Sequence, residues 1–277
     1  MKSQLDPESF SFLRDFIYLR SGIFLSDKDA GLLDARLARR LRDLGLSSFG
    51  AYAAFLQGPE GSTESAALVD AVTTNYTSFF RDADHFQFLC ADVLPRLLRE
   101  NERAGRCSIR GWSAGCSTGE EAYSIAMSFA EASRDFDRRD FRLLATDINR
   151  KVIRMAVRGV YPDSKLARIP QEYFYKYLVR DGETPQGFMR VSDEIRRLIL
   201  FRRANVLLEP EGFQKRFDFI FCKNVMMYFD QPTQEKLVNR MYLYLRSGGY
   251  LFTAPAECMK AVSHGFQFVS PTIHRRP

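Results

Sequence analysis

IRGWSAGCSTGEEAYSIAM, residues 109–127, contains a strand, a tight turn and a helix in succession. The apolar run 107–112 predicts the strand, and the small residues 113–119 allow the backbone to turn tightly and to approach a ligand closely. Apolar side chains from Tyr123 to Ala130 then recur at helical spacing. This order is typical of the first unit of a nucleotide-binding α/β fold.

The residues of this turn leave several ligands open. A phosphate-binding P-loop requires Lys after its last glycine, but Glu120 and Glu121 stand there and would repel phosphate. A dinucleotide-binding G-x-G-x-x-G pattern lacks its second glycine here, so that match is weak. S-adenosylmethionine carries no phosphate and has two cationic groups, which carboxylates would attract. A purely structural turn without a ligand remains an alternative.

The same stretch also contains the pattern G-x-S-x-G at residues 111–115, which marks the nucleophile of many serine hydrolases. Asp218 or Asp230, followed by His264 or His274, could complete a catalytic triad in the correct order. A hydrolase of this type has several strands before its nucleophile, however, and the preceding residues are almost wholly helical in pattern. The sequence therefore disfavours a hydrolase.

Composition narrows the class of protein. The chain has 277 residues, is 45% hydrophobic and carries a formal charge of +6, which suits an acidic partner but is too small to argue for nucleic acid. Its five cysteines are scattered, and with three histidines and no C-x-x-C pattern we expect reduced core thiols and no metal site. Since no apolar signal or 18-residue apolar run is present, we expect a cytoplasmic protein without membrane insertion.

The pattern of elements predicts a helical N-terminal domain over residues 1–72, a linker or lid over 73–84, and an α/β domain over 85–277. Within the last, residues about 159–204 interrupt the alternation of strands and helices. We interpret this interruption as a small β-subdomain grafted on for partner contact.

Three short antiparallel strands are expected in that insertion, over residues 177–180, 188–191 and 199–201, with a turn at 159–162.

Two groups of polar residues have both a structural and a functional interpretation. In the linker, Asn75 and Thr77 together with Arg81 would face a ligand if the segment is a lid, whereas a simple connector would only pack its aromatic residues. Arg36, Arg39 and Arg40 cluster on one predicted helix. They form either a solvated face or a docking surface for an acidic helix.

Acidic and amide side chains follow two predicted strands. Residues 141–147 form an apolar strand that ends in Asp147, the position at which Rossmann-type folds bind ribose hydroxyls. The alternative role for Asp147 is to cap the helix that starts near Asn149. Asn224 ends the buried strand 217–225, at the edge where open α/β sheets bind ligands.

Taken together, these segments closely resemble the CheR-type chemotaxis receptor glutamate methyltransferases over residues 5–257. The motifs that carry the resemblance are TTNYTSFFR, WSAGCSTGEEAYSIAM, ATDI, FDFIFCKNVMMYFD and GGYLF. It implies a Rossmann-like class I S-adenosylmethionine-dependent methyltransferase sheet, an all-helical N-terminal domain and a small antiparallel β-subdomain insertion. The implied reaction transfers a methyl group to a receptor glutamate, yielding a glutamyl methyl ester and S-adenosylhomocysteine. The alternatives are methylation of a non-chemotaxis signalling protein and a non-catalytic module that binds the cofactor.

The resemblance also implies residue roles. Arg81 and Tyr228 fall on the catalytic side, and Arg180, Gly187 and Arg190 resemble a module that grips a receptor's C-terminal peptide tether. The implied partners are the helical methylation region of chemoreceptors and that tether, with the enzyme a monomer. The sequence departs from the family at residues 253–257, TAPAE, where members usually carry Gly-His-Ser-Glu and only the glutamate matches. The implied cofactor contacts are Asn75, Thr77, Arg81, Ala114, Gly115, Glu121, Asp147, Ile148, Asn205, Val206, Asn224 and Val225.

Overall fold

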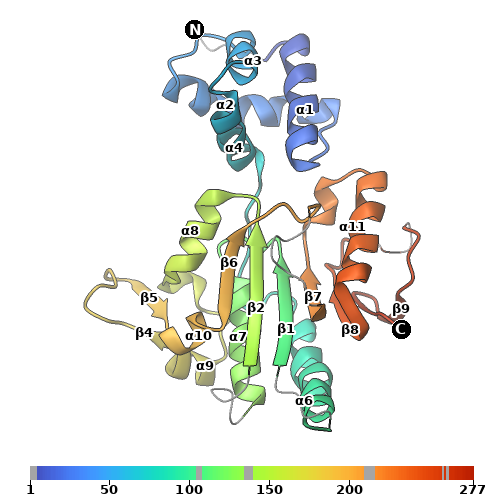
Figure 1. The fold of residues 1–277 in the computed structure, drawn as a ribbon. Coiled ribbons are helices and arrows are strands. Elements are labelled where there is room, and N and C mark those ends of the chain that lie inside the picture. Colours follow the sequence, from blue (N-terminus) through green and yellow to red (C-terminus); the bar gives the residue numbers. More distant parts are fainter. Residues whose placement is uncertain (1–4, 104–107, 134–139, 209–215, 258, 260–261) are drawn as a thin grey trace. The chain divides into compact units, whose positions relative to one another are not determined.

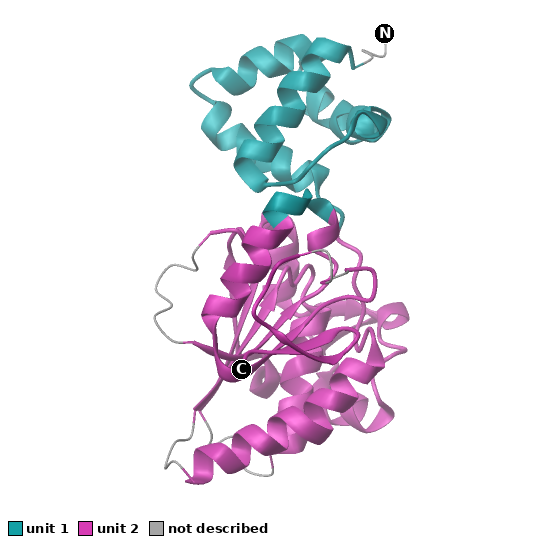
Figure 2. Cartoon of the chain, turned by 90° about the vertical axis from the view of Figure 1, so that its right-hand side faces the viewer, with its two compact units in different colours: residues 1–74, 228–233 teal, residues 75–227, 234–277 magenta. Residues whose placement is uncertain are grey.

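The computed structural model describes residues 5–103, 108–133, 140–208, 216–257, 259 and 262–277. Two compact units make up the chain, coloured separately in Figure 2. Unit 1 comprises residues 1–74 and 228–233, and unit 2 comprises residues 75–227 and 234–277. Two of the five cysteines, Cys107 and Cys258, lie outside the described residues.

Unit 1 is helical, as expected for the N-terminal region. The first helix begins after Asp6, whose Oδ1 accepts a hydrogen bond from the Ser9 N–H at 2.8 Å, and it ends at Gly22 with a φ of 80°. Buried leucines spaced four residues apart, Leu33, Leu37 and Leu41, turn one side of the second helix into the core. The helices are α1 (Pro7–Ser21), α2 (Ala30–Asp43), α3 (Phe49–Gln57) and α4 (Gly61–Val72), with a 3₁₀ turn at Asp27–Asp29.

Unit 2 is built on a seven-stranded sheet with the order β6-β2-β1-β7-β8-β10-β9 (Figure 1). The first five of these strands run parallel, and β10 and β9 add an antiparallel edge. The strands are β1 (Ser108–Ala114), β2 (Asp140–Asp147), β6 (Ile199–Arg203), β7 (Phe217–Cys222), β8 (Leu245–Phe252), β9 (Gln267–Ser270) and β10 (Ile273–Arg275).

Helices cover both faces of this sheet. On one face, alternate residues of β2, namely Phe141, Leu143 and Ala145, join the main core with α5, α6 and α7, and Phe129 stacks on Phe141 with ring centroids 4.0 Å apart. On the other face, Trp112 packs against Tyr244 of α11. The helices are α5 (Ala83–Phe88), α6 (Leu94–Arg103), α7 (Glu120–Ala132), α8 (Arg150–Arg158), α9 (Gln171–Tyr177), α10 (Asp193–Arg196) and α11 (Gln231–Tyr244).

The helical segment that precedes β1 contains an irregular turn. Between α5 and α6 lies a π-helical turn, Leu89–Val93. Short 3₁₀ turns also occur at Asp163–Lys165 and Met226–Tyr228.

The small antiparallel sheet exists, but one of its three strands was predicted wrongly. Its order is β3-β5-β4, with β3 at Val160–Pro162, β4 at Leu178–Val179 and β5 at Phe188–Val191. Residues 159–162, expected as a turn, supply β3, because Pro162 is tolerated on an edge strand. Residues 199–201, expected here, instead belong to β6, which pairs in parallel with β2. A short apolar run does not reveal which sheet it joins.

Neither a membrane-spanning helix nor a metal site emerges from the described residues. None of their helices has the length and apolar character needed to cross a bilayer. They also contain no group of three or more His, Cys, Asp or Glu side chains arranged to hold a metal ion.

Candidate functional site

Four neighbouring parallel strands bring most of the expected cofactor residues to one edge of the sheet. The register pairs Ala114 at the end of β1 with Thr146 of β2 and with Cys222 of β7, and it pairs Asp147 with Arg203 of β6. Because parallel strands end at the same edge, the residues that directly follow each strand gather there. Those residues are Gly115, Ile148, Asn205, Val206, Asn224 and Val225.

The glycine turn after β1 is held tightly against the neighbouring strand ends. Gly115 has a φ of 82°, and its N–H and that of Cys116 donate to the Thr146 carbonyl at 2.8 and 2.9 Å. A Cβ atom at position 115 would lie only 2.4 Å from Cγ2 of Val225. Both the backbone angle and the close approach therefore require glycine at this position.

Asp147 holds this turn from the end of β2. Its Oδ2 accepts from the Ser117 N–H and its Oδ1 from the Asn149 N–H, both at 2.9 Å, and the residue is 8% exposed. Asn149 is the residue that caps α8, since its Oδ1 accepts from the N–H groups of Lys151 and Val152. Asp147 therefore fixes the backbone of the glycine turn relative to the end of β2.

The two acids of the turn, Glu120 and Glu121, have different surroundings. Glu120 is fully buried and receives Lys165 Nζ at 2.6 Å. Glu121 accepts from Ser113 Oγ at 2.8 Å, and burial raises the pKa of its carboxyl although the charge of Lys223 opposes that shift. The Ser113 hydroxyl is buried and donates to a carboxylate, so the serine hydrolase interpretation lacks a nucleophile.

Residues 75–82 approach the same edge. The Asn75 carbonyl accepts from Ser117 Oγ at 3.2 Å, and the guanidinium of Arg81 donates to the Tyr76 carbonyl at 3.3 Å and lies 5.6 Å from the Tyr76 ring centroid. Thr77 is half-buried. This segment is thus attached to the glycine turn through Asn75.

A buried lysine, Lys223, ties the segment to the sheet. Lys223 lies directly after β7, and its side chain is only 2% exposed. Its Nζ donates to the Arg81 carbonyl at 3.0 Å, pairs with Asp82 at 2.8 Å and lies 3.6 Å from Glu121. We made no prediction for Lys223 from the sequence. The available signal was a cation that interrupts an apolar run of strand residues.

Glu257 is a second residue for which we predicted no defined role. Its Oε1 accepts from the N–H groups of Val225 and Met226 at 2.7 and 2.8 Å, and its Oε2 accepts from the Ala254 N–H at 2.8 Å. Burial raises the pKa of this carboxyl. Glu257 therefore fixes the backbone that follows Asn224, which itself has a φ of 59°. Only its match to the family's glutamate marked it in the sequence.

Tyr228, expected on the catalytic side, groups with unit 1. There its carbonyl oxygen accepts a hydrogen bond from the Phe24 N–H at 2.8 Å.

The three arginines of α2 have different partners within unit 1. Arg40 is paired with the buried Glu64, which also accepts from the Tyr52 hydroxyl at 2.7 Å. Arg36 donates to the Val72 carbonyl and, at 2.6 Å, to Thr74 Oγ1. Arg39 is 84% exposed and lies 3.8 Å from Asp43. Of the three, Arg39 is the most accessible to a partner.

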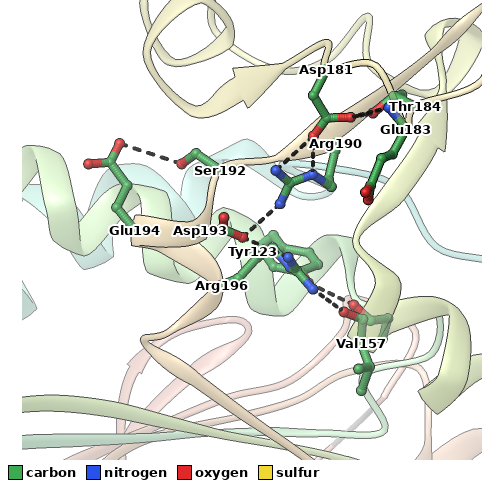
Figure 3. A network of polar contacts seen from close by, with 11 residues as sticks. Tyr123, Val157, Asp181, Glu183, Thr184, Arg190, Ser192, Asp193, Glu194 and Arg196 are labelled. Atoms are coloured by element: carbon green, nitrogen blue, oxygen red, sulfur yellow. Dashed lines mark hydrogen bonds and ion pairs between the residues drawn. The ribbon is translucent and has the colours of Figure 1, made fainter.

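In the β-subdomain, Arg190 lies at the centre of an ionic network (Figure 3). Its guanidinium pairs with Asp181 at 2.8 Å and Asp193 at 2.7 Å, and Asp193 also receives Arg196. Arg180 is half-exposed and pairs with Asp163 at 3.0 Å. Gly187 has a φ of 77° and open space around it.

Comparisons with known families cover both units. The model for "CheR methyltransferase, all-alpha domain" matches residues 8–73, and the model for "CheR methyltransferase, SAM binding domain" matches residues 75–274. Together they confirm the expected fold class, including the helical N-terminal region and the methyltransferase sheet.

Individual proteins agree with this result. Chemotaxis protein methyltransferase 2 of Pseudomonas aeruginosa is 39% identical, covering 96% of this chain and 92% of the relative. The chemotaxis protein methyltransferase of Borreliella burgdorferi is 34% identical, covering 98% and 95%. Among solved structures, TrmN from Thermus thermophilus is 15% identical with a TM-score of 0.38, covering 66% of this chain and 48% of that one, and the assignment does not depend on it.

The resemblance seen in the sequence is therefore confirmed. The chain belongs to the CheR methyltransferase family and is an S-adenosylmethionine-dependent methyltransferase of chemotaxis.

Proposed function

We propose that this enzyme works in the cytoplasm as a monomer and methylates glutamate side chains in the helical methylation region of chemoreceptors, forming glutamyl methyl esters. One observation supports the use of S-adenosylmethionine in this proposal most directly. The strands β6, β2, β1 and β7 end at one edge, where a glycine turn and two acids, Glu121 and Asp147, come together. Acids and a tight turn without a phosphate-binding lysine suit a cationic nucleoside better than a nucleotide.

The residues at this edge fit S-adenosylmethionine, which supplies an electrophilic methyl group on its sulfonium. Asp147 would receive the ribose hydroxyls, and Glu121 would attract the cationic end of the cofactor. Asn75, Thr77 and Arg81 would cover the cofactor, with Ala114, Gly115 and Ile148 beside it. Asn205, Val206, Asn224 and Val225 would line its remaining side.

The acceptor chemistry requires alignment more than proton transfer. A glutamate carboxylate is already ionised near pH 7, since its ordinary pKa is about 4.3. The protein therefore has to orient the carboxylate and exclude water from it. Arg81 supplies a cation for a carboxylate, and Tyr228 is assigned to the acceptor side.

Binding and kinetic measurements on an Arg81 variant distinguish whether this residue holds the cofactor's carboxylate or the acceptor's. If the Arg81→Ala variant loses affinity for S-adenosylhomocysteine, Arg81 holds the cofactor's carboxylate. If that affinity is kept and only the KM for receptor rises, Arg81 holds the acceptor instead.

Two surfaces are proposed for receptor contact. On α2, the exposed Arg39, with Arg36 and Arg40 beside it, would face the acidic receptor helices. In the β-subdomain, Arg180, Gly187 and Arg190 would grip the receptor's C-terminal tether. A hollow of about 400 Å³ lined by Arg180, Asp163 and Met189 supports this second assignment.

The decisive experiment incubates the protein with methyl-labelled S-adenosylmethionine and membranes that contain chemoreceptors. We expect label on the receptor that mild base releases, which is the mark of a methyl ester. Receptors whose methylation-site glutamates are changed to alanine serve as the matched control and should stay unlabelled. Base-stable label, or equal labelling of the control receptors, would contradict the proposal.

A further inference from the structure

A second hollow lies in the methyltransferase unit, beside α5 and α7. Its volume is about 520 Å³, which is within the range of small-molecule sites, about 300–1,000 Å³. None of the residues assigned above to the cofactor or the acceptor lines it. The residues proposed for methyl transfer therefore leave this hollow without an assigned function.

Three aromatic rings form one continuous wall of the hollow. The ring centroid of Phe80 lies 5.0 Å from that of Phe86 and 5.6 Å from that of Tyr173. Such a wall favours a flat ring, which can pack face or edge against its neighbours.

The polar groups of the hollow include one cation available to a ligand. Arg168 lines it and is exposed, and within the described part of the chain no ion pair or hydrogen bond engages its guanidinium. Gln87 contributes an exposed amide nearby. The hollow's one acid, Asp82, is already paired with Lys223 at 2.8 Å. A ligand with a single anionic group would thus meet a free cation and no free acid.

The backbone around the hollow is unusual. Phe80 and Asp82 both have left-handed backbones, with φ angles of 48° and 60°, which residues other than glycine rarely adopt. The π-helical turn Leu89–Val93 contributes Cys90 to the lining. Strained residues and π-turns concentrate at functional sites.

The strained pair also connects the hollow to the cofactor edge. Between Phe80 and Asp82 lies Arg81, whose carbonyl accepts from Lys223 at 3.0 Å. The Phe80 N–H donates to Ser124 Oγ of α7 at 3.0 Å. A ligand packed on Phe80 would favour the observed conformation of this segment, which is the conformation that places Arg81 near the cofactor edge.

We propose that this hollow binds a planar aromatic molecule with one anionic group, and that the occupant tightens binding of the cofactor. The coupling to the cofactor rests on the function proposed for Arg81 and its neighbours. Binding of the aromatic anion in the hollow does not depend on that function.

Anilinonaphthalenesulfonate, a flat aromatic anion that fluoresces in apolar sites, is a suitable probe for the full chain. Its dissociation constant is measured by fluorescence with and without saturating S-adenosylhomocysteine, and that of S-adenosylhomocysteine by calorimetry with and without the probe. We expect each ligand to tighten the other by the same factor, about fivefold or more, because coupling between two sites is reciprocal.

Two variants at lining residues from different segments of the chain locate the probe. Arg168→Glu removes the cation and Ala83→Trp fills the space, and each should weaken probe binding about tenfold while the affinity for S-adenosylhomocysteine alone stays unchanged. The matched control is Arg154→Glu, an exposed arginine on α8, which should bind the probe like the wild type.

The outcomes separate the two proposals. Probe affinity that survives both Arg168→Glu and Ala83→Trp would overturn the site, and equal probe affinity with and without S-adenosylhomocysteine would overturn the coupling. Failure to methylate receptors would refute the proposed function but would change neither of these binding measurements.

Discussion

Replacing Asp147 with alanine tests the ribose assignment at the scale of one side chain. Loss of a charged hydrogen bond should weaken S-adenosylhomocysteine binding by about 1.5–3 kcal/mol, or roughly 10- to 150-fold in Kd. Calorimetric titration measures this. The control is Asp140→Ala, at the opposite end of the same strand, which should bind like the wild type. Unchanged affinity in Asp147→Ala would remove the assignment.

Replacing Lys223 with methionine tests whether the buried cation beside the cofactor edge stabilises the fold. In Lys223→Met, Asp82 and Glu121 lose the charge that lies 2.8 and 3.6 Å from them. A buried acid left without its partner destabilises a protein by about 3 kcal/mol or more, so the denaturant midpoint should fall.

The double variant Lys223→Met with Asp82→Asn should recover part of that stability, because it removes one of the stranded charges. A midpoint equal to the wild type in the single variant would show that the charge of Lys223 contributes little.

At the scale of single elements, α2 carries an exposed arginine that we propose for docking, Arg39, and an arginine paired with a buried acid, Arg40. Arg39→Glu should reduce receptor methylation without changing the denaturation midpoint, because Arg39 is 84% exposed and distant from the core. Arg40→Glu should destabilise unit 1 by about 3–5 kcal/mol, because it sets a second acid beside the buried Glu64. Receptor methylation and chemical denaturation, measured together, separate the two effects. If Arg39→Glu methylates the receptor as fast as the wild type does, the exposed face of α2 has no role in receptor contact.

Helix α5 carries a pH-dependent contribution to stability. Burial of His85 lowers its pKa to about 4, and the charge of Lys223 adds to that shift. The folded protein therefore binds this proton less tightly than the unfolded chain, whose histidine has a pKa of about 6.5. The contribution is complete above pH 6.5 and is lost as the pH falls toward 4. Denaturation in that interval should show a shallower decline for His85→Asn, and equal slopes would contradict this.

Elements whose signals are local in the sequence were predicted correctly, whereas contacts between distant segments were not. The strands around the glycine turn were predictable because local signals agree there, as with the apolar strand that ends in Asp147. Residues 199–201 were assigned to the wrong sheet, because strand pairing depends on partners distant in sequence. For the same reason Lys223 and Glu257 were missed: their partners come from segments that are remote along the chain.

At the scale of the whole molecule, net charge should affect receptor encounter more than cofactor binding. The formal charge of +6 favours approach to an acidic receptor surface. We expect kcat/KM for receptor to fall severalfold as salt rises from about 0.05 to 0.5 M, since the screening length shortens to a few ångströms. Cofactor affinity, measured in the same buffers, is the internal control and should change little. A salt-independent kcat/KM would argue against electrostatic steering.

Unit 1 is assembled from two distant parts of the chain, residues 1–74 and 228–233. The first helix and the residues just after it receive late partners, since the Tyr18 hydroxyl donates to Asp230 at 3.1 Å and the Phe24 N–H donates to the Tyr228 carbonyl. On the ribosome, the four N-terminal helices emerge long before these residues are translated. The nascent helical unit therefore waits for most of the sheet to be synthesised before its last contacts can form.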